Sequence, residues 1–255
     1  EDTDRIWMVA GEDPFATFLY AGTAAQLALV LPRDPEGVEG KREAVEAYAW
    51  ALQHSADNSV AQTPRLKHQR AYASACLLAL TGETSYEKQL HLDTSWIEAR
   101  TYLEEPSMIY APAVLLLSGK GERTMRERLT QAIVHTARQD LIETAEKRAL
   151  RWGGNFYMPM LIGQQTTPLV FSGMVAHHLL LSRDRSQAEE IRAALYSTAD
   201  YFLGHNSLNQ TWITGVGPRY PTQIFHMDAW YNGRGEYHPG LIPYSPWRKE
   251  KDQGQ

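Results

Sequence analysis

From residue 14 to residue 203 the sequence repeats one pattern: apolar side chains return every three or four positions, and polar or Gly/Pro-containing stretches separate the runs. This spacing puts the apolar side chains on one face of an α-helix. No stretch shows the alternation that is typical of a half-buried β-strand. The pattern predicts helices over residues 14–31, 41–54, 64–81, 108–117, 122–150, 167–181 and 187–203, with a less regular segment at 83–105.

Local signals mark where some of these helices begin and end. Asp13 followed by Pro14 is typical of an N-cap and a first helical residue. We therefore interpret Glu12 and Asp13 as a helix start rather than as a pair of acid/base carboxylates. Gly82 is typical of a helix stop. Cys76 falls on the apolar face of its helix and is expected to be unreactive.

The succession of helices constrains the fold class. Seven predicted helices with alternately short and long connections indicate an all-α chain of antiparallel helical hairpins packed into a ring or an array. No strict sequence repeat is visible, which disfavours a solenoid of tetratricopeptide type. A chain of 255 residues is long enough for one large domain or two small ones.

Composition excludes several classes of partner. The formal net charge is −5, so the chain has no basic field for a nucleic acid. No apolar run approaches the roughly 18 residues that predict a membrane span. The single cysteine excludes a disulfide within this chain and a metal cluster held by several cysteines. The first residues, EDTDRIWMVAGEDP, do not have the pattern of a signal peptide.

Residues 204–247 are the most informative part of the sequence for function. Prolines and glycines recur throughout this stretch, so no helix runs through it. Long ordered loops are usually functional, and disordered segments are poor in aromatic residues. We therefore predict a proline-stiffened surface on which aromatic faces and polar groups meet a sugar; the alternative is a loop whose rings close the end of a helical core. Its eight aromatic residues are Trp212, Tyr220, Phe225, Trp230, Tyr231, Tyr237, Tyr244 and Trp247.

Motifs for metals and for other chemistries are absent from the sequence. His177 and His178 are adjacent on a helix and point to different faces, and the remaining histidines lack the spacing of a zinc site. No phosphate-binding loop, dinucleotide fingerprint or GxSxG motif occurs. We expect no required cofactor. A structural calcium ion stays open, because the loop is rich in oxygen donors although it has no EF-hand-like motif.

A resemblance to a known family lies at residues 199–221, which read ADYFLGHNSLNQTWITGVGPRYP. This stretch resembles the late helix-plus-loop signature of glycoside hydrolase family 9, of the form DY-LG-N-…-TG-G-…-P. Residues 10–28 and 151–163 also resemble segments of that family, so the resemblance covers most of the chain in family order. The matching residues of the signature are Asp200, Tyr201, Leu203, Gly204, Asn206, Thr214, Gly215, Gly217 and Pro221.

The resemblance implies an (α/α)6 barrel, incomplete in this chain. Residues 1–255 would be part of a single catalytic domain, with helices at about 14–203 and a substrate-loop region at 204–247. It also implies hydrolysis of β-1,4-linked glucan with inversion at the anomeric carbon. Such enzymes use a base and an acid carboxylate that lie roughly 6.5–9.5 Å apart, which leaves room for the attacking water.

Neither of the family's catalytic carboxylates is found in this sequence. The family's base aspartates lie in an Asp-Ala-Gly-Asp type motif near the start of the domain, and its acid is a glutamate that follows the histidine loop. This chain has no such aspartate motif, and it ends at KDQGQ before the expected glutamate. We therefore expect the catalytic residues outside this chain, and little or no activity from the chain alone.

Three polar or charged residues are candidates for substrate binding. By resemblance, His226 would hydrogen-bond a sugar hydroxyl next to the scissile bond; the alternative is a structural histidine. Asp228 stands where the common cellulase pattern has arginine. Its carboxylate accepts hydrogen bonds and attracts a cation, such as the ammonium of glucosamine, or else it caps a turn. Arg219 either contacts substrate or, as we favour, pins the loop by pairing with Asp228 or Glu236.

Three aromatic residues are candidates for stacking on the substrate. Trp152 lies in the RWGGN turn and is either a sugar platform or a core residue, and Trp230 and Tyr231 are platforms on the loop. Together these residues predict a hydrolase of cellulose or cello-oligosaccharides. The alternatives are an exo-acting β-glucosaminidase and a non-catalytic saccharide-binding module. The resemblance also implies a secreted or periplasmic protein whose partner is a saccharide rather than a nucleic acid or a membrane.

Overall fold

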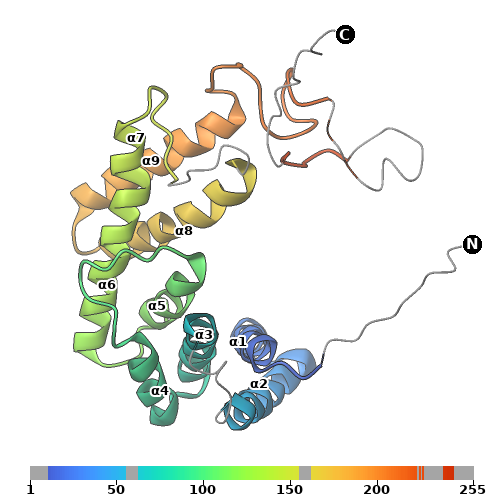
Figure 1. Ribbon diagram of the computed structural model, residues 1–255, viewed down its shortest axis with the longest axis vertical. Helices are drawn as coiled ribbons and strands as arrows, with labels where there is room; N and C mark the ends of the chain where they lie inside the picture. Colours follow the sequence, from blue (N-terminus) through green and yellow to red (C-terminus); the bar gives the residue numbers. More distant parts are fainter. Residues whose placement is uncertain are drawn as a thin grey trace, which may run out of the picture. The chain divides into compact units, whose positions relative to one another are not determined.

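The computed structural model describes residues 11–55, 63–154, 162–222, 224, 226 and 238–243, and within 162–169 it describes the backbone. Every regular element in these ranges is helical, which confirms the predicted all-α class (Figure 1). In chain order the elements are α1 (Pro14–Val30), α2 (Pro35–Ser55), α3 (Pro64–Thr81), α4 (Thr84–Thr94), α5 (Pro106–Ser118), α6 (Arg123–Ala137), the π-helical turn η2 (Arg138–Glu143), α7 (Thr144–Glu146), α8 (Ile162–Leu180) and α9 (Arg185–Leu203).

The chain divides into two compact units, residues 1–132 and residues 133–255. In the first unit α3 is central, and it packs against α1, α4 and α5, while α2 lies along α1. In the second unit α8 and α9 pack against each other and against η2. The pairs α1–α2, α3–α4 and α8–α9 are therefore hairpins of consecutive helices, and α3 also packs against α1 and α5, the helices next but one in the chain.

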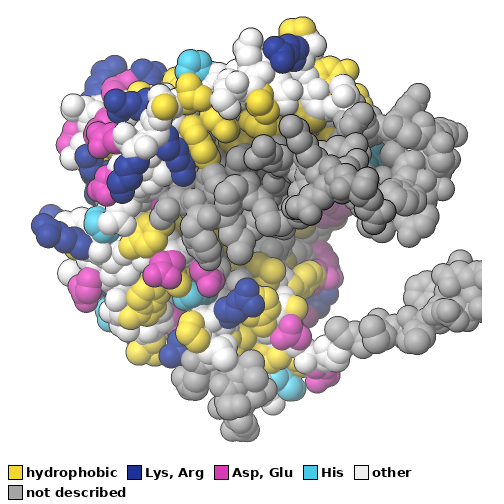
Figure 2. Space-filling view, turned by 45° about the horizontal axis from the view of Figure 1, so that its top comes forward, with side chains coloured by type: hydrophobic (Ala, Val, Ile, Leu, Met, Phe, Trp, Pro, Cys, Tyr) yellow, Lys and Arg dark blue, Asp and Glu magenta, His cyan; other side chains and the backbone are white. Residues whose placement is uncertain are grey.

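The helices differ in how many charged residues they contain. α1, α5 and α8 contain no Asp, Glu, Lys or Arg, whereas α2, α6 and α9 are rich in them. A helix that is apolar all round is typically surrounded by protein, and an amphipathic helix covers it on one side. The pairs α1–α2 and α8–α9 each combine one helix of either kind. On the outside, charges of both signs lie between hydrophobic side chains (Figure 2).

Caps fix the helix ends as the sequence predicts. The Asp13 carboxylate accepts a hydrogen bond from the Phe15 N–H at 2.9 Å, which confirms its role as the N-cap of α1. Asp184 caps α9 in the same way through the Gln187 N–H at 3.1 Å. Gly82 ends α3 in the left-handed conformation with φ of 76°. Each cap satisfies backbone groups that would otherwise lack a partner at the helix end.

Two helices extend over stretches that the sequence pattern leaves irregular. α2 begins at Pro35 rather than at residue 41, and α4 occupies part of 83–105. The first turns of α2 need its glycines, because a Cβ at Gly37 would lie 1.8 Å from the Leu31 carbonyl oxygen and one at Gly40 would lie 3.1 Å from the Ala24 carbonyl oxygen. Packing of the helix start against α1 therefore overrides the weak helical propensity of glycine.

The helix predicted over 122–150 is interrupted. α6 ends at Ala137, η2 follows, and α7 ends at Glu146. The wider turn buries Asp140, Leu141 and Ile142, and the Thr144 hydroxyl donates to the Gln139 carbonyl at 2.8 Å. Such insertions are frequently found at functional sites. Here the turn lies beside the RWGGN segment, which is part of the candidate site.

A buried ion pair stabilises the first unit. The Arg70 guanidinium donates two hydrogen bonds to the Asp93 carboxylate, at 2.8 and 2.6 Å, and the Gln89 amide adds a third at 3.0 Å. The hydrogen bonds to Asp93 raise the pKa of Arg70, although burial opposes this.

In the described part of the chain, no helix is both long enough and apolar enough to cross a membrane.

Candidate functional site

The loop that follows α9 is tied to the end of that helix. Gly204 ends the helix with φ of 126°, and the His205 N–H donates to the Asp200 carbonyl at 2.8 Å. The buried Asn206 amide donates to the carbonyls of Tyr201 and Gln210 at 2.8 and 2.7 Å. Its side-chain oxygen also accepts the Leu208 N–H at 3.1 Å. The asparagine of the family-like signature therefore closes the first turn of the loop.

The next part of the loop closes on itself through Thr211. Its N–H donates to the Arg219 carbonyl at 2.9 Å, and its hydroxyl lies 2.7 Å from the Val216 carbonyl. Trp212 is buried beside it, and the backbone N–H of Trp212 donates to the Phe202 carbonyl of α9 at 2.8 Å. The ordered loop predicted from the aromatic and proline content is therefore present at residues 204–222.

Arg219 takes part in this closure through its backbone. Its carbonyl accepts the hydrogen bond from Thr211, while its side chain is exposed. Among the described residues its guanidinium has no ion-pair partner. The predicted partners Asp228 and Glu236 lie outside the described residues, so the predicted pairing stays a prediction.

Thr214 joins the loop to a segment that returns much later in the sequence. Its N–H donates to the Leu241 carbonyl at 2.9 Å, and its carbonyl accepts the Gly240 N–H at 2.8 Å. Its hydroxyl donates to the His238 carbonyl at 2.8 Å and accepts the Leu241 N–H at 2.9 Å. The side chain is fully buried. One threonine therefore fixes residues 238–241 against the loop.

This clamp brings two histidines together. The rings of His226 and His238 lie 5.9 Å apart at 87°, in an edge-to-face arrangement. His238 is exposed and His226 is half-buried. The Nδ1 atom of His226 is buried and has no hydrogen-bond partner among the described residues. His226, which was predicted to bind substrate, therefore lies beside a second histidine of the loop, His238.

Residues 151–154, the described part of the RWGGN segment, are held by Arg148. One guanidinium nitrogen donates to the carbonyls of Trp152 and Gly153 at 3.0 and 3.3 Å, and the other donates to the Gly154 carbonyl at 3.0 Å. The Gly153 N–H donates to the Thr198 hydroxyl of α9 at 2.7 Å. Burial lowers the pKa of Arg148 below its ordinary value, but an arginine remains charged at neutral pH.

Trp152 already has two stacking neighbours. The Arg148 guanidinium carbon lies 3.7 Å from the centroid of the Trp152 ring. The Tyr201 ring stacks on Trp152 with centroids 4.5 Å apart at 19°. The predicted stacking of a sugar on Trp152 stays a prediction, and the sugar would have to share the indole surface with these two groups.

Of the six predicted site residues, the structure describes Trp152, Arg219 and His226. Asp228, Trp230 and Tyr231 lie outside the described residues, and their predicted roles are unchanged. Sequence reasoning did not assign a role to Arg148, Thr214 or His238. Thr214 had a signal, because it belongs to the TG-G element of the signature, whereas Arg148 and His238 carry no local motif.

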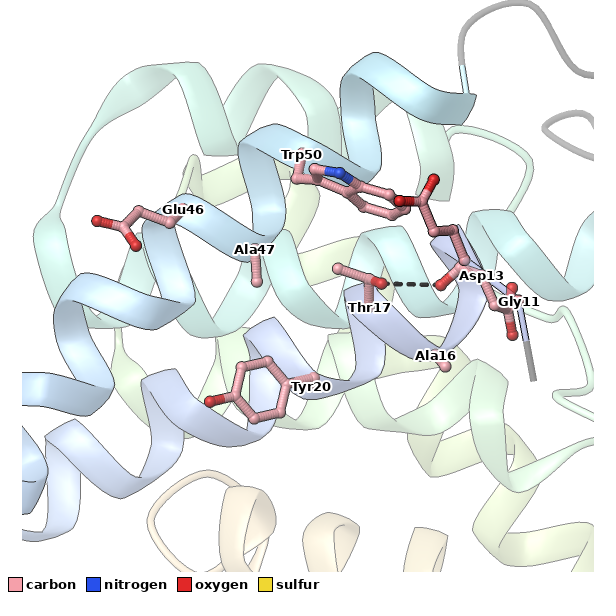
Figure 3. A pocket seen from close by; sticks show the side chains of 9 residues that line it. Gly11, Asp13, Ala16, Thr17, Tyr20, Glu46, Ala47 and Trp50 are labelled. Carbon is pink, nitrogen blue, oxygen red and sulfur yellow. Dashed lines mark hydrogen bonds between the residues drawn. The ribbon is translucent and has the colours of Figure 1, made fainter. Parts of the chain in front are cut away.

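A separate groove of about 680 Å³ lies in the first unit between α1 and α2 (Figure 3). The Thr17 hydroxyl on one wall donates to the Asp13 carbonyl at 2.8 Å, and Glu46 accepts hydrogen bonds from Arg42 at 2.8 and 2.7 Å. Trp50 stacks on His54 with centroids 4.0 Å apart. Because these groups already have structural partners, we centre the candidate site on residues 204–243.

Residues that would hold a metal do not gather in the described ranges. No group of three or more His, Cys, Asp or Glu side chains there is arranged to bind an ion. Cys76 is a free, buried thiol, and burial raises its pKa to about 11. A thiol with so high a pKa is a poor nucleophile at neutral pH, which agrees with the prediction that Cys76 is unreactive.

Comparison with known proteins gives one family. The model of glycosyl hydrolase family 9 matches residues 2–251. The fold resembles a metagenome-derived family 9 endoglucanase with a TM-score of 0.67 and 19% identity, covering 90% of this chain and 42% of that one. It also resembles a single mutant of the thermostable endoglucanase of Alicyclobacillus acidocaldarius, with a TM-score of 0.64 and 20% identity over 95% and 47% of the two chains.

A third similar structure is a family 9 glycoside hydrolase of Bacteroides ovatus, with a TM-score of 0.66 and 18% identity over 94% of this chain and 47% of that one. No curated protein matches the chain. The likeness confirms the predicted fold of helical hairpins from the (α/α)6 barrel class, and the chain spans less than half the length of these structures. Since the family model covers nearly every residue, the chain belongs to glycosyl hydrolase family 9.

Proposed function

We propose that this chain forms part of an enzyme that hydrolyses β-1,4-linked glycans, with cellulose or cello-oligosaccharides as substrate. The match of the family model to residues 2–251 carries the proposal. The similar solved structures include two endoglucanases, which agrees with this substrate class. The role of the chain would be to supply the substrate loop rather than the catalytic carboxylates.

The chemistry of the loop supports a glycan ligand. A pyranose has an apolar C–H face that packs on aromatic rings and a rim of hydroxyls that donate and accept hydrogen bonds. The stretch 204–247 combines aromatic residues with His226, Asp228 and His238. A neutral imidazole offers one donor and one acceptor, which matches a hydroxyl. The hydrogen bonds of Asn206 and Thr214 would hold such groups in place before the ligand arrives.

We infer an inverting mechanism whose two carboxylates lie outside this chain. The sequence has no Asp-Ala-Gly-Asp motif, and the solved relatives are more than twice as long as the part that this chain matches. One carboxylate would activate a water and the other would protonate the leaving oxygen, at a separation of roughly 6.5–9.5 Å. The loop of this chain would bind and orient the sugar between them.

Further expectations follow from membership of the family. We propose an exported protein whose partner is an oligosaccharide or a polysaccharide. The proposal requires no cofactor for the hydrolytic step, because acid and base catalysis by two carboxylates needs none. A structural calcium ion in the oxygen-rich loop remains an expectation that a calcium titration would test.

Binding and turnover measurements on the 255-residue chain test this proposal. We expect cellotetraose to bind, as seen by calorimetry, while cello-oligosaccharides stay intact. A longer polypeptide that also carries both carboxylates should release the α-anomer first, as seen by proton NMR, because inversion converts the β-linkage. Normal glucanase turnover by the chain alone would contradict the placement of the carboxylates, and release of the β-anomer would contradict inversion.

Asp228 motivates a second substrate, an amino-sugar oligosaccharide. It replaces the arginine of the common cellulase pattern, and a carboxylate attracts the ammonium of glucosamine. Calorimetry with chitosan and cello-oligosaccharides on wild type and Asp228→Arg separates the two. If only the amino sugar binds and the substitution abolishes this, the amino sugar is the ligand. If cello-oligosaccharides bind and the substitution changes little, Asp228 has a structural role in its turn.

A further inference from the structure

We propose that His238 is a second saccharide-contacting histidine beside His226, and that Thr214 is the positioning residue that holds it there. The proposal rests on the proposed glycan-binding function of the loop, and it adds two residues to that site. The clamp around Thr214, the close approach of Gly215 to Pro239 and the geometry of the histidine pair support it.

Thr214 makes contacts that a purely local role does not require. Its backbone N–H and C=O pair with Leu241 and Gly240, and its hydroxyl bonds both His238 and Leu241 at 2.8 and 2.9 Å. The hydroxyl thus uses its donor and an acceptor on a segment 24 to 27 residues further along. Replacing the hydroxyl by a methyl group would therefore remove the hydrogen-bond partner of two backbone groups, the His238 carbonyl and the Leu241 N–H.

Gly215 allows the returning segment to come close. A Cβ at this position would lie 2.9 Å from the Pro239 Cβ, and its φ of 72° is in the left-handed region that favours glycine. Pro239 follows His238 directly, so this contact and the Thr214 bonds restrain the backbone at the histidine and on its C-terminal side. The His238 side chain therefore stays exposed while its backbone is held in place.

The imidazoles of His226 and His238 lie close enough together to bind the same ligand. Their ring centroids lie 5.9 Å apart and their planes are nearly perpendicular, at 87°. A pyranose carries several hydroxyls, and each can donate to or accept from a neutral imidazole. His238 is exposed and therefore reachable. We infer that the pair binds two hydroxyls of one sugar unit.

Calorimetric titration with cellotetraose tests the proposal on the 255-residue chain. We expect His238→Ala to raise Kd about three- to tenfold, the effect of losing one hydrogen bond of about 1 kcal/mol. His205→Ala is the matched control, because His205 is an exposed histidine of the same loop whose ring makes no contact with His226 or His238 in the described residues. We expect this control to leave Kd unchanged.

Thr214→Val should raise Kd to a similar extent, and Thr214→Ser should restore it because serine keeps the hydroxyl. Thr94→Val is the control, because it removes a buried threonine hydroxyl of the first unit that donates to the Leu90 carbonyl of its own helix. We expect it to leave Kd and the histidine signals unchanged. The imidazole NMR signals of His226 and His238 should move in Thr214→Val and return in Thr214→Ser. This readout reports ring position even where stability also falls.

The outcomes distinguish a failure of the proposed role of His238 and Thr214 from a failure of the proposed glycan-binding function. If the wild type binds cellotetraose and His238→Ala binds as tightly as His205→Ala does, the role of His238 is wrong while the proposed function stands. If Thr214→Val leaves the histidine signals unmoved, Thr214 does not position the pair. If the wild type binds neither cello- nor chitosan oligosaccharides, the proposed function fails and the histidine pair fails with it.

Discussion

Arg148 shows how a single side chain can define the shape of a turn. Its guanidinium donates to the carbonyls of Trp152, Gly153 and Gly154 and covers one face of the Trp152 ring. These groups come from consecutive residues, so the turn must curl around the planar cation. Lysine is a compact point charge and does not reproduce this geometry.

We therefore expect Arg148→Met to lower the free energy of unfolding by at least about 3 kcal/mol, because a hydrogen bond to a charged group contributes about 1.5–3 kcal/mol and a stacked cation adds more. Arg148→Lys should recover less than half of this loss. Urea denaturation followed by circular dichroism measures both variants. Equal stability of Arg148→Lys and the wild type would mean that charge alone holds the turn.

Cys76 makes a prediction about pH. Burial raises the pKa of its thiol to about 11 in the folded chain, against an ordinary value of 9.0. The folded state then holds a proton that the unfolded state releases, so stability falls as pH rises from about 9 to about 11. The denaturation midpoint should drop over this range, and the drop should be smaller in Cys76→Ala. An identical pH dependence in the two proteins would remove Cys76 as a cause.

Among the elements, helix starts and stops were predictable because their chemistry is local. Asp13 caps α1 and Gly82 ends α3, where the sequence placed them. The start of α2 and the π-helical turn η2 were not predictable. They depend on the approach of Gly37 to Leu31 and on the fit of Leu141 against Gly153 and Gly173, which residue spacing does not contain.

The same distinction applies to the candidate site. The aromatic, proline-rich loop and His226 were recognisable from composition and motif. The role of Thr214 was not, because its partners His238 and Leu241 lie 24 and 27 residues away and only the folded chain brings them together. Trp152 is an aromatic residue of the kind that stacks on sugars, but only the folded chain shows that Arg148 and Tyr201 already stack on it.

The contact between η2 and the RWGGN turn gives a prediction at the scale of elements. A Cβ at Gly153 would lie 2.7 Å from Leu141 Cδ2 and 3.0 Å from Leu141 Cα, so the turn could not approach η2 as it does. Gly153→Ala should destabilise the chain by about 1–3 kcal/mol, the usual effect of overpacking. Gly11→Ala is the control, because its added Cβ meets nothing within 4 Å. Thermal unfolding of both variants checks this, and equal melting temperatures would contradict the tight approach.

The charge-free helix α1 gives a second prediction at this scale. Val30 is 74% exposed and Leu27 is 40% exposed on a helix without any charged residue. Exposed apolar surface of this kind promotes association. We expect Val30→Lys to reduce self-association at high concentration while leaving the melting temperature within about 1 °C, since exposed positions contribute little to stability. Static light scattering measures the association, and unchanged scattering would show that α1 does not drive it.

At the scale of the whole molecule, the chain is a set of helical hairpins that belongs to glycosyl hydrolase family 9 and spans less than half the length of its solved relatives. Its charge-free helices α1 and α8 each pack against a charged helix, α2 and α9, as expected of hairpins in which one helix covers another. The residues that we propose for glycan recognition belong to the second unit, at 148–154 and 204–243. The first unit contributes a separate groove between α1 and α2.

The most direct test of the proposed function follows backbone amide NMR signals of the 255-residue chain during titration with cellotetraose. We predict signal shifts that saturate and are concentrated in residues 204–243, including His226 and His238, with little change in α1 and α2. No hydrolysis product should accumulate. Shifts confined to the α1–α2 groove, or no shifts at all, would contradict the assignment of the substrate loop.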